Sequence, residues 1–237
     1  MAFAGAALAA LFTGGFNLWA DDRKRRLAES AKLVRKYRDP LLLEAQDLQS
    51  RLYSIACGDT LDLIDPNDPI EQENLYVYSS FLVGQFFTWT YIYRRQAQFM
   101  GGPTNEETRN LTAIIFSIRS EFNQLDVEPD RRPFRVWRGQ QLAIGEIMTV
   151  REKDEKEFFC MGYAAFKERW DTDQTFKGWF MPVCAAIEEF YLARKRHEPL
   201  LDQRLRRLQH LLVDLICLLD PKGLQNVQPA YTPLAKD

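Results

Sequence analysis

Apolar and polar positions repeat with a helical period along most of this chain. Leu41, Leu48 and Ile55 belong to a series spaced by three or four residues, which is the spacing of one apolar helix face. Asp39-Pro40 comes just before the series, and the two residues suit the N-cap and first position of a helix. We therefore expect a new helix to begin at residue 39 and the chain to bend there.

The same period returns in later segments. A capping pattern begins at Thr104 and continues through Asn105 and the two glutamates after it. No run alternates for long enough to suggest a sheet. The expected fold is all-α, a single helical bundle over residues 39–223 followed by a loose tail at 224–237. Further helices are expected at 70–100, 106–122, 137–150, 158–170, 176–192 with a kink at Pro182, and 201–219.

The opening run contains no charged side chain from Ala2 to Ala20. As a helix it would be about 28 Å long, close to the roughly 30 Å of a membrane hydrocarbon core. A secretory signal would start with basic residues, which are missing here. We expect a membrane anchor at residues 1–20, and the alternative is an alanine-rich helix docked on the rest of the fold.

The segment after this run, residues 21–38, is strongly basic and begins with Arg23, Lys24, Arg25 and Arg26 after two aspartates. By the positive-inside rule, this flank stays in the cytoplasm. The expectation is a single-pass membrane protein with a basic juxtamembrane helix and its C-terminal domain on the cytoplasmic side. A second uncharged run over 75–93 contains Gln85 and several tyrosines, and we interpret it as a buried core helix.

Overall composition excludes several functional classes. The formal net charge is −2, so no global field favours nucleic acid, and none is expected as a partner. No C-x-x-C pair is present, and only two histidines occur, so we expect no metal, no cofactor and a reducing compartment. The four cysteines are expected to be buried free thiols: Cys57, Cys160, Cys184 and Cys217.

The most unusual local chemistry is the stretch "RRPFRVWRGQQ", where arginines alternate with aromatic residues. Guanidinium groups bind phosphate through paired hydrogen bonds, and aromatic rings can stack or insert at an interface. An anionic lipid headgroup or a phosphorylated ligand would fit this stretch. Alternatively, the arginines cap helices and pair with acidic residues of the chain. The candidate ligand-binding residues here are Arg131, Arg132, Arg135, Trp137 and Arg138.

Two further groups of polar residues are candidates for function. Gln85 lies on an apolar face, and Glu146 would have a raised pKa if its helix were buried. His210 and Asp214 are four residues apart, which is close enough for a carboxylate to orient an imidazole. Together with Arg207 they are expected to form a solvated, partner-facing stripe.

Four stretches resemble an uncharacterised family of helical proteins that often carry an N-terminal hydrophobic segment. They are "KYRDPLLLEAQDLQSRLYSI", "FLVGQFFTWTYIYRRQAQF", "FRVWRGQQLAIGEIM" and "RLQHLLVDLICLLDP". The resemblance covers most of residues 35–222. It implies an anchored helical architecture and carries over no activity and no catalytic residue.

The leading functional hypothesis is a membrane-anchored interaction protein. Residues 2–20 would insert in the membrane, and the cytoplasmic helical domain would bind an unknown partner protein or an anionic ligand. Common nucleotide-binding, hydrolase and zinc-protease motifs are missing from the sequence. The alternative is a membrane-associated enzyme that acts on an apolar or phosphorylated substrate. A closed pocket containing Gln85, Glu146 and an arginine would favour this alternative.

Overall fold

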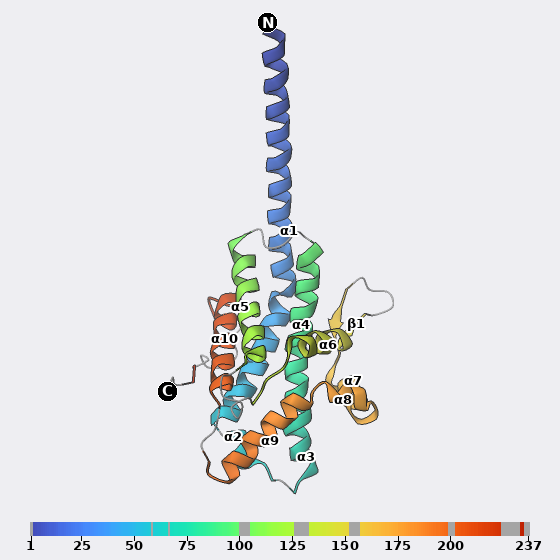
Figure 1. Cartoon of the computed structure of the whole chain (residues 1–237), viewed down its shortest axis with the longest axis vertical. Helices are drawn as coiled ribbons and strands as arrows, with labels where there is room; N and C mark the ends of the chain where they lie inside the picture. The colour runs from blue at the N-terminus through green and yellow to red at the C-terminus, as the bar shows by residue number, and fades with distance from the viewer. Residues whose placement is uncertain are drawn as a thin grey trace.

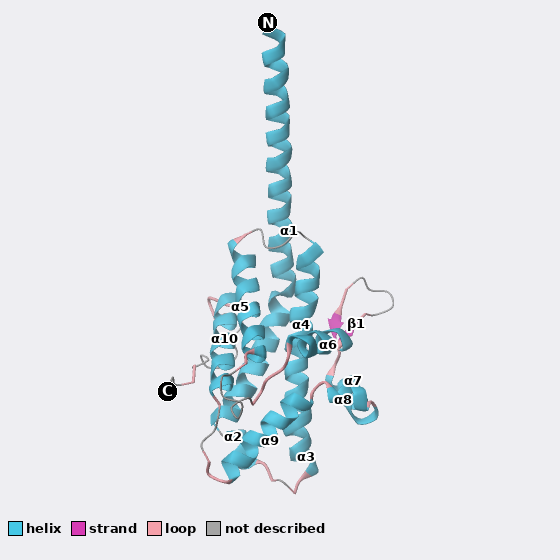
Figure 2. Ribbon diagram, viewed as in Figure 1, coloured by secondary structure: helices cyan, strands magenta, loops and turns pink. Residues whose placement is uncertain are grey.

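The computed structural model describes most of the chain as helix (Figure 2). The described residues are 2–57, 59–65, 67–99, 105–125, 133–151, 157–198, 202–223 and 233–234, without the side chains of 2–20, 59 and 99. The all-α prediction is confirmed. The elements are α1 (Ala2–Cys57), α2 (Asp59–Leu63), α3 (Pro69–Glu73), the π-helix η1 (Asn74–Tyr78), α4 (Ser79–Phe99), α5 (Glu106–Asn123), α6 (Arg138–Ile147), β1 (Thr149–Val150), β2 (Phe159–Cys160), α7 (Tyr163–Thr172), α8 (Gln174–Gly178), α9 (Met181–Lys195) and α10 (Gln203–Leu219).

Four long helices form the body of the molecule, and α1 is packed against the other three, α4, α5 and α10 (Figure 1). The predicted apolar face of α1 is buried, since Leu41, Leu48 and Leu52 have no exposed surface. The leucine series of α10 is buried in the same core. The Arg38 Nε donates to the carbonyl oxygen of Leu219 at 2.6 Å, which ties α1 to the end of α10.

The first part of α1 projects beyond the bundle, and its lower part leans away from that direction as it enters the core (Figure 1). None of residues 21–29 is buried, and the first buried side chain is Ser30. The prediction that a new helix starts at residue 39 is wrong, because α1 continues through Pro40. Packing on both sides of the proline holds the helix together despite the lost hydrogen-bond donor.

No helix in the part of the chain with described side chains is long and apolar enough to cross a membrane. The expected anchor at residues 2–20 forms the start of α1. The side chains of residues 2–20 are not among those that the structure describes.

The predicted helix at 70–100 is divided into α3, η1 and α4. Its interpretation as core is confirmed, since Phe86, Phe87 and Tyr93 are almost completely buried. The N-cap of α5 is Asn105, whose side chain accepts a hydrogen bond from the Thr108 amide at 2.7 Å. Thr104, which was expected to begin this cap, lies outside the described residues.

Three smaller expectations need correction. Pro182 lies in the first turn of α9 and does not kink a helix interior, as its missing amide donor allows. An antiparallel hairpin whose strands have two residues each pairs Thr149 with Cys160. Strands this short leave no alternating pattern in the sequence. Cys217 is exposed, unlike the buried thiol that was expected.

Candidate functional site

A tight turn before α6 fixes the positions of the residues in the arginine-rich stretch. Phe134 has a φ of 66°, in the left-handed region that side chains with a Cβ rarely adopt, and its ring is buried. Arg204, a buried residue of α10, donates to the carbonyl oxygens of Pro133 at 3.1 Å and Gln124 at 2.6 Å. These bonds from α10 hold the strained turn in place.

Buried Gln141 fixes the other side of this turn. Its Nε2 donates to the carbonyl oxygens of Val136 at 2.9 Å and Arg119 at 3.0 Å, while its Oε1 accepts from the Arg119 Nε at 3.1 Å. The Val136 amide also donates to the Phe122 carbonyl at 2.8 Å. The backbone after Arg135 is therefore anchored to α5 and α6, and the backbone before it is anchored to α10.

Arg135 and Trp137 form the first of two cation–aromatic pairs. The guanidinium carbon lies 4.3 Å from the centre of the indole, within the range of a cation–π interaction. The indole is 44% exposed. The Nη1 of Arg135 is buried and has no hydrogen-bond partner among the described residues.

Arg138 forms the second pair with Phe116 of α5. Its guanidinium carbon lies 4.8 Å from the ring centre, and its Nη2 donates to the Ser120 Oγ at 2.6 Å. The Phe116 ring is 62% exposed. The Arg138 backbone amide donates to the Asn123 Oδ1 at 2.9 Å, so both the backbone and the side chain of Arg138 are held against α5.

Arg94 of α4 is a third cation beside Arg138. Burial and the positive charge of Arg138 lower the pKa of Arg94 below its ordinary value. Across the described part of the chain, no carboxylate forms an ion pair with Arg94, Arg135 or Arg138. We call Arg94, Phe116, Arg135, Trp137 and Arg138 the arginine patch.

The patch contains three of the five residues predicted from the arginine-rich stretch. Arg131 and Arg132 lie outside the described residues. Arg94 was not predicted, because it belongs to a different helix and follows an apolar run with no recognisable motif. Only the packing of α4 against α6 brings its guanidinium beside Arg138.

Gln85 has a polar partner that the sequence did not suggest. Its Nε2 donates to the Oε1 of Glu44 at 3.1 Å, across the interface between α4 and α1. The other oxygen, Oε2, is buried without a hydrogen-bond partner in the described structure. Burial, followed by the charge of Asp47, raises the pKa of Glu44 to about 7. Gln85 therefore crosslinks two core helices through a carboxyl group that titrates near neutral pH.

Glu146 is exposed on α6, so its helix does not bury it as the hypothesis required. Gln85 faces Glu44 of α1 instead. The structure does not bring Gln85, Glu146 and an arginine into one closed pocket, which is the arrangement that would have favoured an enzyme.

The three residues of the expected stripe on α10 have separate surroundings. His210 is half-buried, and its Nε2 lies 2.6 Å from the carbonyl oxygen of Leu234. Arg207 Nη1 lies 3.7 Å from the Glu121 Oε1, and Asp214 is exposed. Leu234 is itself buried, so this residue packs against the bundle.

Comparison with protein families, with curated proteins and with solved structures gives no match for this chain. Within the described residues, no group of three or more histidine, cysteine, aspartate or glutamate side chains could hold a metal ion. A function for this chain is therefore inferred from the geometry of the arginine patch.

Proposed function

We propose that this chain is a membrane-anchored interaction protein whose cytoplasmic helical domain binds a phosphate-bearing anion at the arginine patch. The observation that carries the proposal is that Arg135 and Arg138 each lie over an exposed aromatic ring and pair with no described carboxylate. The positive charge of Arg138 also acts on Arg94. Two adjacent positive charges repel each other, and an anion between them removes that repulsion. Guanidinium groups suit phosphate because each can donate two parallel hydrogen bonds.

The exposed rings of Phe116 and Trp137 add a second binding element. Each ring already has a guanidinium over its face, so the patch presents apolar and cationic surface together. This combination fits a lipid headgroup at a membrane interface or a soluble phosphorylated molecule.

Anchoring by residues 2–20 is supported by the uncharged sequence and by the way α1 projects from the bundle (Figure 1). The exposed residues 21–29 would then form a helical stalk. If the stalk stood upright, the ten residues from Ala20 to Ser30 would place the bundle about 15 Å from the hydrocarbon edge. Arg94, five residues before the end of α4, would lie roughly 7 Å farther away. Headgroup binding thus requires the domain to lean over, whereas a soluble phosphate ligand does not.

The test compares the binding of a chain beginning at Ala28 to neutral liposomes, to liposomes containing phosphatidylserine, and to soluble inositol hexakisphosphate. Binding to anionic liposomes should be stronger than to neutral ones and should weaken with salt. R138Q should weaken binding about fivefold, since one cation near such a surface contributes about 1 kcal/mol. R109Q removes the same charge from an exposed position on α5, and serves as the matched control.

The outcomes separate the possible ligands. Binding to the soluble phosphate alone would assign the patch to a soluble ligand. Binding to anionic liposomes alone would assign it to a headgroup. Equal binding to neutral and anionic surfaces, or equal effects of R138Q and R109Q, would overturn the anion proposal and leave the partner-protein hypothesis standing.

A further inference from the structure

A second candidate site lies at the end of the molecule opposite the N-terminus, where α3 and α9 are found (Figure 1). There, residues of α3, η1, α7, α8 and α9 line an open-sided cavity of about 550 Å³. This volume is within the range of small-molecule sites. The exposed side chains of Met181 and Glu188 lie at its rim, so a ligand could enter from the surrounding water.

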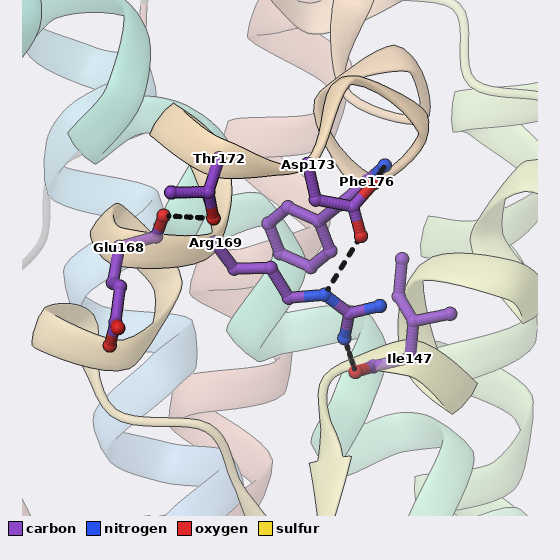
Figure 3. A network of polar contacts seen from close by, with 6 residues as sticks. All are labelled: Ile147, Glu168, Arg169, Thr172, Asp173 and Phe176. Carbon is purple, nitrogen blue, oxygen red and sulfur yellow. Dashed lines mark hydrogen bonds and ion pairs between the residues drawn. The ribbon is translucent and has the colours of Figure 1, made fainter.

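One wall of the cavity is held in place by Arg169 (Figure 3). Its Nε donates to the Asp173 Oδ2 at 3.3 Å, and its Nη1 donates to the carbonyl oxygen of Ile147 at 3.2 Å. Asp173 also caps α8, accepting from the Phe176 amide at 2.9 Å. The network fixes α7 relative to α8 and to the end of α6, and so positions the cavity-lining residues Lys167 and Trp170.

Lys167 has its charge satisfied within the protein. Its Nζ binds Asp171 one turn away on α7 and lies 3.5 Å from the Glu73 Oε2 of α3. This ion pair closes the gap between two walls of the cavity. Lys167 therefore joins α7 to α3 through its ion pairs, and its charge is not available to a ligand.

Lys177 and Glu188 are different, because neither forms an ion pair with any residue of the described structure. The Lys177 Nζ lies 5.4 Å from the centre of the Trp170 ring. Glu188 accepts a hydrogen bond from the Tyr76 hydroxyl. The cavity thus presents a positive charge at Lys177 and a negative charge at Glu188, each positioned by an aromatic side chain, in addition to the Lys167 ammonium that two carboxylates share.

Part of the remaining lining is apolar. Val77 and Trp170 are buried and line the cavity, and Met181 extends the apolar surface to the rim. Aromatic and thioether side chains favour an aromatic or large aliphatic group. A ligand that used the whole site would carry an ammonium group, a carboxylate and an apolar body.

We propose that this cavity binds an amino acid with a large apolar side chain. The ligand ammonium would bind Glu188, its carboxylate would bind Lys177, and its side chain would lie against Val77, Trp170 and Met181. The site is independent of the arginine patch, since the two share no residue.

The experiment measures binding of three probes to the full chain in mild detergent by isothermal titration calorimetry. L-Tryptophan carries both charges, tryptamine lacks the carboxylate, and indole-3-propionate lacks the amine. We expect L-tryptophan to bind at least tenfold more tightly than either of the other probes. E188Q should reduce the affinity for L-tryptophan tenfold or more and leave the affinity for indole-3-propionate unchanged. K177Q should also reduce the affinity for L-tryptophan tenfold or more, but it should leave the affinity for tryptamine unchanged.

E189Q is the matched control, because Glu189 is the exposed neighbour of Glu188 on α9 and does not line the cavity. It should bind all three probes like the parent chain. Circular dichroism would verify that each variant keeps its helices. The proposal is overturned if L-tryptophan binds no better than the single-charge probes, if no probe binds, or if E189Q weakens binding as much as E188Q.

Discussion

The two parts of α1 belong to one helix and have opposite surroundings. From Ser30 onward, the helix lies at the centre of the bundle and buries a continuous apolar face. Over residues 21–29 no side chain is buried. One of the two aspartates there, Asp22, pairs with its own neighbours, Arg25 at 2.7 Å and Arg26 at 2.8 Å. The first part is therefore stabilised by local contacts and the second by tertiary packing.

A single continuous helix can therefore contain parts with different roles. Helical propensity and local charge pairs are enough to continue the helix past the bundle, but they do not bury an apolar surface. In the proposed function, a membrane supplies that burial for residues 2–20. The predictions below test whether the two parts of α1 are energetically as separate as their surroundings indicate.

The largest effect is expected in the packed part. Leu52 is completely buried, so L52A should lower the free energy of unfolding by about 3 kcal/mol, through lost burial and the cavity that remains. L27A, in the projecting part, should change it by less than about 0.5 kcal/mol. Urea unfolding followed by circular dichroism measures both, and similar losses would show that the projecting part also packs on the fold.

Pro40 lies just inside the packed part, and its substitution should act in the opposite direction. A proline within a helix costs roughly 3 kcal/mol relative to alanine, and P40A also removes some packing of the half-buried ring. We expect a net gain of about 2 kcal/mol in the free energy of unfolding. A loss of stability would mean that the change of direction in α1 is required for core packing.

Glu44 gives the packed part a dependence on pH. Its pKa of about 7 in the folded protein lies above the ordinary 4.5, so the folded state holds the proton more tightly and stability falls as pH rises through this interval. E44Q should match the parent at pH 4 and be more stable by about 1 kcal/mol at pH 8, a value reduced because the residue is only partly buried. The exposed E146Q should show no such change in unfolding experiments at the two pH values. A constant difference across pH would contradict the raised pKa.

The smallest effect is expected from removing the projecting part. A chain beginning at Ala28 should unfold with the same free energy as the full chain, within about 0.5 kcal/mol, in the same detergent. Thermal and urea unfolding of both chains would measure this. A molten domain would show that residues 2–27 contribute to the core.

Helices with a strong apolar period could be predicted from the sequence. Leu208, Leu212 and Leu215 are all buried as expected, because one face of α10 has a single environment along its length. The sequence was misleading at Pro40, where a favourable start signal lies inside a longer helix. Tertiary contacts on both sides outweigh the local preference there.

The candidate site could be predicted only in part. Arg135, Trp137 and Arg138 are close in sequence, so their shared surface was visible as a motif. Arg94 and Glu44 were missed because their neighbours Arg138 and Gln85 are on other helices, 44 and 41 residues away in the chain. No local pattern reports such a pairing.

The most direct test of the account is alkaline carbonate extraction of membranes that contain either the full chain or the chain beginning at Ala28. The account predicts that the full chain stays in the membrane pellet, because residues 2–20 span the bilayer. The shorter chain should be released into the supernatant with an unchanged helical spectrum. Release of the full chain by carbonate would contradict the membrane anchor.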